Sequence, residues 1–223
     1  MYSVIVSSVD ASRLNNILLP SLERIKKFLF DNQLPPLQII VINGSESITK
    51  NYNDGMLKSK NRLKFFIHDD VDIMDIEDVP LFVKIDNLFL GRARPALVGL
   101  AGTQGLSNGW WWETPKEKMV GRVFMGGNIQ QLWDWNSEKD VYSNVNYIDG
   151  IFMATDTNTP FSEDIKGFHL YDSDYCNKMR LYGYEISVIN HLVKHEWFKK
   201  DFSTDFTYYR QKWNLGSESL RNY

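Results

Sequence analysis

The sequence predicts an α/β fold in which helices cover both faces of a mostly parallel central sheet, a three-layer α/β/α arrangement. Short β-branched runs alternate with segments whose apolar residues recur at helical spacing, which is the pattern of successive βα units. The strand-like runs are nearly continuously apolar, as is typical of strands buried on both faces. With 223 residues, 43% of them hydrophobic and 24% charged, the chain can form one such domain.

The elements follow from the amino terminus. The first strand is expected over residues 3–7 (SVIVS). Apolar residues from 14 to 29 recur at helical spacing, so a helix should follow, with Asp10 or Ser12 as its cap and a kink or break at Pro20. The same reasoning predicts strands over residues 37–42, 63–67, 96–101, 148–154 and 185–189, and helices over residues 45–60, 79–89 and 170–182. Between residues 102 and 146 the periodicity is lost, and no regular element is predicted.

The charge of the chain excludes a nucleic-acid-binding role. The net charge is -3, and lysine and arginine are scattered along the sequence without forming a basic patch. A phosphate-containing ligand would have to be held locally, through a divalent cation. Cys176 is the only cysteine, so no intramolecular disulfide can form, and no apolar stretch is long enough to cross a bilayer. We expect a cytoplasmic protein without a transmembrane segment.

Polar side chains follow three of the predicted strands, at residues 7–10 (SSVD), 43–45 (NGS) and 68–72 (HDDVD). In parallel α/β sheets ligands bind beyond the carboxyl ends of the strands, so these segments are candidates for one binding site. The first segment lacks glycine, which argues against the glycine-rich phosphate loops of dinucleotide-binding proteins and ATPases. Asp69, Asp70 and Asp72 offer the oxygen ligands that Mg²⁺ or Mn²⁺ prefers; the alternative is that they only cap the next turn.

Two further groups are candidates for the same site. Asp172 and Asp174 begin a predicted helix, whose dipole would keep a carboxylate ionised at neutral pH as a general base; the alternative is an N-terminal cap. His191 and His195 are four residues apart, a spacing that binds zinc on a helix, but the β-branched residues before them favour a strand. His195 then either joins the carboxylate-bound metal or is an ordinary surface histidine.

Five tryptophans lie in the stretch without periodicity. Trp110, Trp111 and Trp112 follow one glycine, and Trp133 and Trp135 come after a glycine pair. Such side chains can stack on sugar rings, and they can equally fill the core beneath a loop.

Four motifs, in this order, carry a resemblance to a known family: SVIVSS, IIVINGS, FFIHDDVDI, and YIDGIFMAT followed by FHLYDSDYCNKMRLYGYEISVINHLVKHE. They resemble family-two-like GT-A glycosyltransferases, including the bacterial subgroup with an HDDV-type sequence at the metal site. The resemblance implies a GT-A fold, a Rossmann-like three-layer α/β/α domain with a mostly parallel central sheet, over residues 1–196. Residues 197–223 would form an aromatic-rich extension packing on this domain, either closing over the acceptor site or touching a membrane surface.

The resemblance also implies roles for individual residues. The nucleotide-sugar donor would contact Val6, Ser7, Ser8, Asn43, Asn53, Lys58, Asp69, Asp149 and Gly150. The family's DxD motif corresponds to residues 68–70, so the resemblance favours Asp70 over Asp72 as a ligand of Mn²⁺ or Mg²⁺; His195 stays a candidate ligand from its place beyond a strand end. Histidine at position 68 replaces the usual first acid, which bears on ribose binding and on metal affinity.

The implied reaction is an inverting sugar transfer. Asp172 would deprotonate an acceptor hydroxyl, which attacks the anomeric carbon from the face opposite the diphosphate. The donor would be a UDP-sugar and the acceptor a glycan or a lipid-linked molecule, in bacterial surface polysaccharide or glycoconjugate synthesis, in the cytoplasm or at the inner face of the membrane. The alternative is a catalytically inactive nucleotide-sugar-binding or glycan-binding domain of the same fold. A sugar-phosphate nucleotidyltransferase is disfavoured because it needs a glycine-rich first loop.

Overall fold

A seven-stranded sheet forms the centre of the computed structural model, which describes residues 1–44, 47–74, 80–91, 96–107, 109–196 and 206–215. Its strands, in spatial order, are β2 (Leu37–Asn43), β1 (Tyr2–Ser8), β3 (Leu63–His68), β11 (Phe152–Thr155), β5 (Ala96–Gly99), β12 (Glu185–Ile189) and β9 (Val141–Tyr142). β1 pairs in parallel with β2 and β3, and β5 with β12, whereas β11 and β9 run antiparallel to their neighbours. Five of the seven strands therefore share one direction, as expected for a mostly parallel sheet.

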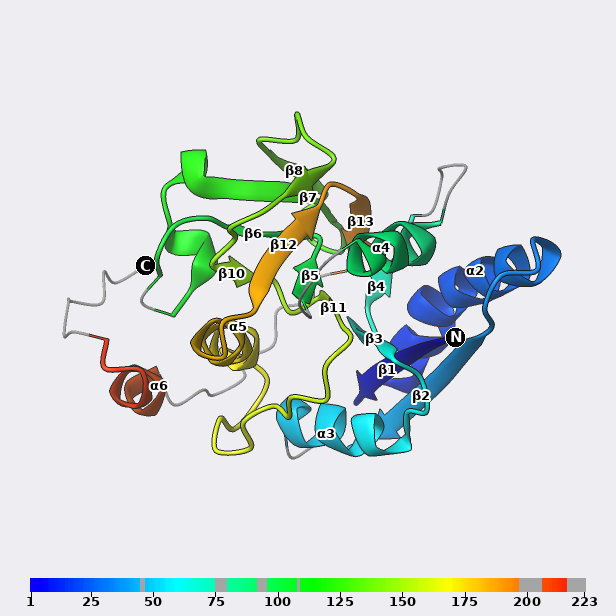
Figure 1. Cartoon of the computed structure of the whole chain (residues 1–223), viewed down its shortest axis with the longest axis horizontal. Helices are drawn as coiled ribbons and strands as arrows, with labels where there is room; N and C mark the ends of the chain where they lie inside the picture. The colour runs from blue at the N-terminus through cyan, green and yellow to red at the C-terminus, as the bar shows by residue number, and fades with distance from the viewer. Residues whose placement is uncertain (45–46, 75–79, 92–95, 108, 197–205, 216–223) are drawn as a thin grey trace.

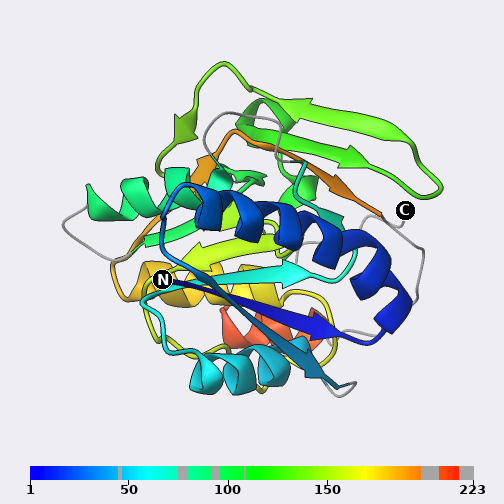
Figure 2. The same cartoon turned by 90° about the vertical axis from the view of Figure 1, so that its right-hand side faces the viewer.

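Helices cover both faces of this sheet (Figures 1 and 2). α2 (Leu19–Asp31) and α4 (Leu81–Leu90) lie on one face, and α3 (Ile48–Lys58) and α5 (Tyr171–Leu181) lie on the other. On β3, Phe65 stacks on Phe82 of α4 with ring centroids 4.0 Å apart, whereas Phe66 packs against Tyr52 of α3 at 4.9 Å. Successive residues of a strand face opposite sides, so a strand that is apolar throughout needs helices on both. The predicted α/β fold class is confirmed.

The first helical segment is divided into three parts. α1 (Ala11–Arg13) begins after Asp10, whose carboxylate accepts hydrogen bonds from the backbone N–H groups of Ser12 (3.0 Å) and Arg13 (3.3 Å). A π-helical turn, η1 (Leu14–Leu18), leads into α2, and Pro20 stands in the first turn of α2. Proline has no N–H to donate to the preceding turn, so regular α-helical bonding cannot run through this point. The irregularity expected at Pro20 takes the form of this π-helical turn just before it, the chain stays helical through this point, and Asp10 is the cap.

A second, six-stranded sheet continues from the carboxyl ends of the first. It contains β10 (Tyr147–Ile148), β6 (Ala101–Thr103), β7 (Met119–Met125), β13 (Leu192–His195) and β4 (Val71–Asp72), with β8 (Gln131–Trp135) paired to β7 (the green strands at the top of Figure 2). β4, β6 and β13 directly follow β3, β5 and β12 along the chain. The chain therefore passes from one sheet to the other at the strand ends, where the polar motifs lie.

The second sheet corrects two sequence predictions. The single strands expected over residues 96–101 and 148–154 are each divided between the two sheets, because the chain turns where they meet. Residues 102–146, for which no element is predicted, contain β7, β8, β9 and two short 3₁₀ turns, η2 (Trp111–Glu113) and η3 (Lys116–Lys118).

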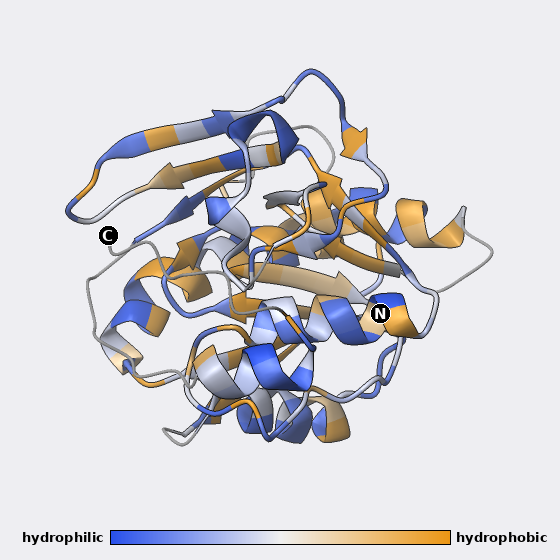
Figure 3. Cartoon of the chain, turned by 90° about the vertical axis from the view of Figure 1, so that its left-hand side faces the viewer, coloured by the Kyte–Doolittle hydropathy of each residue, from blue (hydrophilic) through white to orange (hydrophobic). Residues whose placement is uncertain are grey.

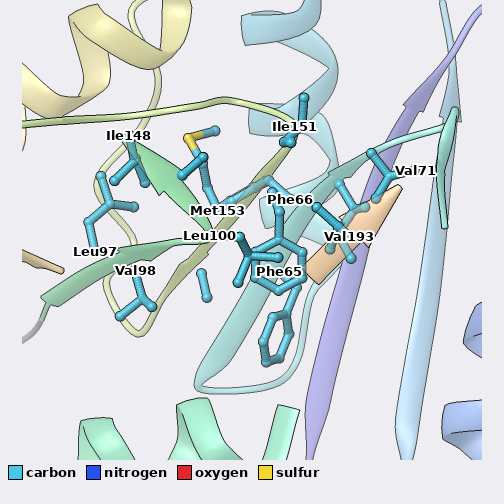
Figure 4. Packing of buried hydrophobic residues seen from close by; sticks show 14 of the residues in the cluster. Phe65, Phe66, Val71, Leu97, Val98, Leu100, Ile148, Ile151, Met153 and Val193 are labelled. Atoms are coloured by element: carbon cyan, nitrogen blue, oxygen red, sulfur yellow. The ribbon is translucent and has the colours of Figure 1, made fainter. Parts of the chain in front are cut away.

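Hydrophobic side chains from both sheets form one buried cluster, which includes Phe65, Met153 and Val193 (Figure 4). In Figure 3 the hydrophobic colour gathers on the inner strands, whereas β8 alternates between hydrophilic and hydrophobic positions. Among the described residues, no helix is both long and apolar enough to cross a bilayer.

The described part of the C-terminal segment packs against α5. α6 (Phe206–Lys212) buries Tyr209, whose hydroxyl accepts a hydrogen bond from Asn177 Nδ2 (3.0 Å). The indole N–H of Trp213 donates to Asp174 Oδ1 (2.9 Å), and Lys212 Nζ lies 2.9 Å from the same oxygen. These contacts engage Asp174 structurally, which leaves Asp172 as the base candidate of this helix. Residues 197–205 and 216–223 of the expected extension lie outside the described residues.

Candidate active site

A cavity of about 410 Å³ lies where the two sheets meet. Its volume is within the range of about 300–1,000 Å³ that is usual for small-molecule sites. Its polar lining includes Ser7, Arg13, His68, Asp69, Asp70, Asp149, His169, Asp172 and His195, and its aromatic lining includes Trp110, Trp111, Trp112, Trp133 and Trp135. The acids near residue 70 and near residue 172 therefore share one cavity.

His68, Asp70 and His195 form a candidate metal centre in this cavity. One ligand atom of each lies within 4.8 Å of the others. Asp70 Oδ1 is 3.4 Å from His195 Nε2 and 4.0 Å from His68 Nδ1. Among the described residues this buried oxygen has no hydrogen-bond partner, a deficit that a bound cation would satisfy. The group fits a divalent ion, and two imidazoles with one carboxylate suit Mn²⁺ or a similar transition ion better than Mg²⁺.

The neighbours of these three groups set their charges. Burial by itself raises the pKa of Asp70, but the proximity and charge of His195, with His68 and Arg13 nearby, hold it at about 2. Burial lowers the pKa of His68 to about 4. Although burial lowers the pKa of His195, the attraction of Asp70 outweighs it, and the net shift is upward. At neutral pH Asp70 is a carboxylate and His68 a neutral imidazole, the forms that bind metals.

Arg13, which sequence analysis does not single out, holds the two adjacent acids. Its guanidinium lies 3.0 Å from Asp70 Oδ2 and 3.4 Å from Asp69 Oδ1. The other oxygen of Asp69 accepts a hydrogen bond from the Ser8 hydroxyl (2.9 Å). One oxygen of Asp70 is therefore turned to Arg13 and the other to the histidines. Its position in the sequence could have indicated this role. Arg13 comes soon after β1, and β1 lies beside β3, whose carboxyl end carries Asp69 and Asp70.

Asp172 stands in the first turn of α5, on the same cavity. Its Oδ2 accepts a hydrogen bond from the backbone N–H of Gly150 (3.1 Å), and its Oδ1 accepts one from Ser173 N–H (2.8 Å). Burial, followed by the charge of Asp149, raises the pKa of Asp172 to about 7. Burial therefore opposes the ionised form that is expected at the start of a helix, and with a pKa of about 7 the group is partly protonated at neutral pH.

Tyr171 and Gly150 join the two groups of acids. The Tyr171 hydroxyl lies 2.5 Å from His68 Nε2, so α5 contacts the candidate metal centre directly. A Cβ at Gly150 would lie 2.0 Å from this hydroxyl, so glycine is required for the close approach. The packing of α5 on this turn places Asp172 and the His68 group in the same cavity.

Four of the expected donor-binding residues line the cavity, namely Ser7, Asp69, Asp149 and Gly150. Val6 is fully buried inside β1, and Ser8 is buried and bonded to Asp69, so the side chains of both serve the scaffold. Asn43 is exposed at the end of β2, the strand at the edge of the main sheet, and does not line the cavity.

The donor-binding roles expected for Asn53 and Lys58 are not supported by their positions. Asn53 Nδ2 donates hydrogen bonds to Phe161 O (3.0 Å) and Glu163 Oε1 (2.9 Å), so its amide holds a loop. Lys58 is the last residue of α3, and this helix runs from the carboxyl ends of the strands back to their amino ends. There its carbonyl accepts a hydrogen bond from Gln38 Nε2 at the start of β2 (3.4 Å).

Asp72 and His191 lie outside the candidate metal centre. Asp72 Oδ1 is 2.8 Å from the guanidinium of Arg24 on α2. The preceding residue is fully buried, and strand alternation turns Asp72 to the other side. His191 is buried before β13, and because residues 192–195 form a strand, the helical zinc spacing with His195 does not arise. His68 joins the group in place of Asp72.

The fold and the site define the class of protein. Acids and imidazoles at the strand ends of an α/β sheet, with a separate buried carboxylate on the same cavity, suit a transferase that moves a group away from a phosphate. The chain belongs to the glycosyltransferase-like family, whose model matches residues 22–215. The predicted enzyme class is confirmed at this level, and membership of the HDDV-type subgroup stays a prediction. No curated protein matches the chain in sequence.

Three solved structures have a weak overall likeness to the chain. A197 from STIV is 11% identical with a TM-score of 0.45, over 85% of this chain and 81% of that one. S. aureus TarS 1–349 is 13% identical with a TM-score of 0.49, over 87% and 60%. TarS 1–349 in complex with UDP-GlcNAc is 12% identical with a TM-score of 0.46, over 90% and 59%. The chain spans about three fifths of the TarS fragment, and likenesses this distant carry no argument about the site.

Proposed function

We propose that this protein transfers a sugar from a nucleotide-diphosphate donor to a hydroxyl group of an acceptor, with inversion and with a divalent cation. The observation that carries the proposal is that Asp70, with His68 and His195, lines the same cavity as Asp172. The group around Asp70 could hold a cation that binds the departing diphosphate, and Asp172 could accept the proton of the incoming hydroxyl group. A single cavity containing both is what a displacement reaction requires.

The donor half of the site is assigned to the strand ends. His68, Asp70 and His195 would hold the cation, which would neutralise charge on the departing nucleoside diphosphate when bound. Arg13 fixes the orientation of Asp70 through its 3.0 Å contact. Ser7 and Asp69 line the adjoining surface and are the candidates for nucleoside contacts. UDP-sugars are the first donors to test.

Asp172 is assigned as the general base. It is buried, it lines the cavity, and its pKa of about 7 is well matched to accepting a proton near neutral pH. Backbone N–H groups of Gly150 and Ser173 fix the direction of its carboxylate. The proton of the acceptor hydroxyl would pass to Asp172 as that oxygen bonds to the anomeric carbon and the diphosphate leaves from the opposite face.

The biological setting is a separate proposal, carried by the sequence resemblance alone. It is synthesis of a bacterial surface polysaccharide or glycoconjugate in the cytoplasm, on a glycan or lipid-linked acceptor, with peripheral contact at the inner face of the membrane. Flotation of the whole chain with liposomes, compared with a chain ending at residue 196, tests the membrane contact. Equal absence of lipid association in both contradicts it.

The proposed reaction is tested by donor hydrolysis and transfer with a panel of nucleotide sugars, with Mn²⁺, with Mg²⁺ and after chelation. Asp70→Asn should remove the metal-dependent turnover, because it removes the carboxylate charge from the metal group. Asp72→Asn is the matched control, because Asp72 lies two residues away and contacts Arg24 instead; it should retain activity. A wild-type protein that binds donor with Mn²⁺ but neither hydrolyses nor transfers it is the inactive binding domain described as the alternative.

A further inference from the structure

Five tryptophans form a continuous aromatic wall on one side of the cavity. Here the aromatic wall means Trp110, Trp111, Trp112, Trp133 and Trp135, all of which line the cavity. Neighbouring rings are in contact, with centroids 4.8 Å apart for Trp110 and Trp112, 5.9 Å for Trp111 and Trp112, and 5.5 Å for Trp133 and Trp135. Trp111 and Trp135 connect the two segments at 5.8 Å. Alternation along β8 places residues 133 and 135 on one face of that strand.

The exposure of these rings differs from that of core residues. Trp112 is 46% exposed, and Trp110, Trp133 and Trp135 are only partly buried. Trp111 is the exception, with 1% exposure, and its indole N–H has no hydrogen-bond partner among the described residues. Tryptophans that only fill a core are buried and find a partner for the N–H group. Apart from Trp111, the aromatic wall therefore keeps ring surface outside the core, although Trp110, Trp133 and Trp135 also pack against the core on one side.

Polar groups lie beside the aromatic wall, next to the proposed base. The Ser173 hydroxyl donates to the carbonyl oxygen of Gly109 (2.7 Å), which joins the residue after Asp172 to the residue before Trp110. His169 packs edge-on against Trp110, with ring centroids 5.7 Å apart. A ligand in this half of the cavity meets flat aromatic faces on one side and a carboxylate and an imidazole nearby.

We infer that the aromatic wall is the acceptor subsite and that the acceptor unit bound there is a sugar ring. The inference rests on the proposed transferase function. A pyranose has a C–H face that can lie against an indole and a rim of hydroxyl groups that hydrogen-bond, so it matches both kinds of surface. An acyl or prenyl chain cannot form hydrogen bonds with the polar groups. Trp110 is already stacked on Phe206 (5.8 Å) and lies against Trp112, so Trp112 is the ring with surface available to a sugar, and a sugar stacked there can turn a hydroxyl toward Asp172.

The inference is tested by measuring saccharide binding without a donor. The probes are methyl glycosides of the common hexoses and N-acetylhexosamines and the trisaccharides cellotriose, chitotriose and mannotriose, titrated against tryptophan fluorescence. Vesicles of phosphatidylglycerol with and without polyprenyl phosphate form the lipid arm. At least one saccharide should bind saturably. Trp112→Ala should weaken that binding about two- to tenfold, the range expected for loss of one aromatic contact, and Trp112→Phe should restore part of it.

Tyr182→Ala is the control, because Tyr182 is 57% exposed and does not line the cavity, and it should leave binding unchanged. Metal-dependent donor hydrolysis needs no acceptor, and in Tyr182→Ala both its rate and its KM for donor should also be unchanged. Saturable binding of polyprenyl phosphate vesicles without any saccharide binding overturns the inference, and so does absence of saccharide binding across the panel. A raised KM for donor in Trp112→Ala, with normal saccharide binding, also overturns it. Absence of donor hydrolysis in the wild-type protein would count against the proposed function. It would not affect the test of the acceptor subsite, because saccharide binding is measured without a donor.

Discussion

The pH dependence of transfer is the sharpest test of the role proposed for Asp172. Burial, and secondly the charge of Asp149, raise the pKa of Asp172 from 3.8 to about 7. A general base must be ionised to accept a proton, so the rate should follow the ionised fraction of this carboxylate. With a pKa of about 7, about a tenth of the molecules are ionised at pH 6 and about nine tenths at pH 8, so kcat/KM should rise about tenfold.

The assay measures initial rates of transfer from pH 5 to 9 at saturating donor and Mn²⁺. Asp149→Asn removes the second cause of the raised pKa, so the midpoint of the profile should move to lower pH. Asp72→Asn should leave the midpoint unchanged, because Asp72 does not line the cavity. A profile that is flat between pH 6 and 8, or a residual rate of Asp172→Asn with the same rise, would refute the assignment.

The same pKa predicts the pH dependence of stability. The folded-state pKa of Asp172 lies above the ordinary value of 3.8, so its contribution to stability is fully present below about pH 4 and is lost as pH rises through about 7. The difference corresponds to a cost on the order of 4 kcal/mol once the carboxylate is ionised. Between pH 5 and 8 the free energy of unfolding should fall more in the wild-type protein than in Asp172→Asn. The free energy of unfolding is measured by denaturant titration at each pH. If it changed equally with pH in the wild-type protein and in Asp172→Asn, the burial of this group would be contradicted.

Three further substitutions test other contacts. Arg13→Gln should weaken Mn²⁺ binding about tenfold or more, as loss of a residue that orients a metal ligand commonly does, measured by isothermal titration; unchanged affinity contradicts the positioning role. Gly150→Ala should destabilise the fold by about 1–3 kcal/mol in thermal unfolding and reduce transfer, because the added Cβ meets the Tyr171 hydroxyl; wild-type stability would show that the turn can shift. Asn53→Ala should cost about 1–2 kcal/mol of stability while the Kd for donor stays unchanged, and a raised Kd would return this residue to the donor site.

The main sheet could be predicted because its strands carry their own signal. Runs such as residues 63–67 (LKFFI) are mostly apolar on both alternating positions, and burial on both faces follows from that pattern alone. The second sheet lacks this signal. β4 has only two residues, and β7 contains Gly121 with a φ of 106°, where a Cβ would lie 2.2 Å from the carbonyl oxygen of Leu100. Such strands depend on partners that are remote in sequence, so local periodicity does not reveal them.

The site likewise contains residues that local sequence features predict and residues that only the order of the strands brings in. Asp70 and Asp172 could be predicted because a strand end and a helix start are local features. Arg13 enters the site only because β1 lies beside β3, which brings residues after the first strand next to residues after the third. Lys58 lies away from the site for the opposite reason. The helix α3 begins near the carboxyl ends of the strands, but its length and direction place its last residue at their amino ends.

Histidine at position 68, where the resemblance leads us to expect an acid, links the two halves of the site. Its Nδ1 lies 4.0 Å from Asp70, and its Nε2 lies 2.5 Å from the Tyr171 hydroxyl on the helix that carries Asp172. An aspartate offers no ring with a polar atom on each side, so it could not face the metal group and this hydroxyl in the same way. A neutral imidazole also adds a ligand without adding negative charge beside Asp70. We therefore expect this departure from the family pattern to favour a transition ion over Mg²⁺, and it brings the candidate metal centre into contact with the helix that carries the proposed base.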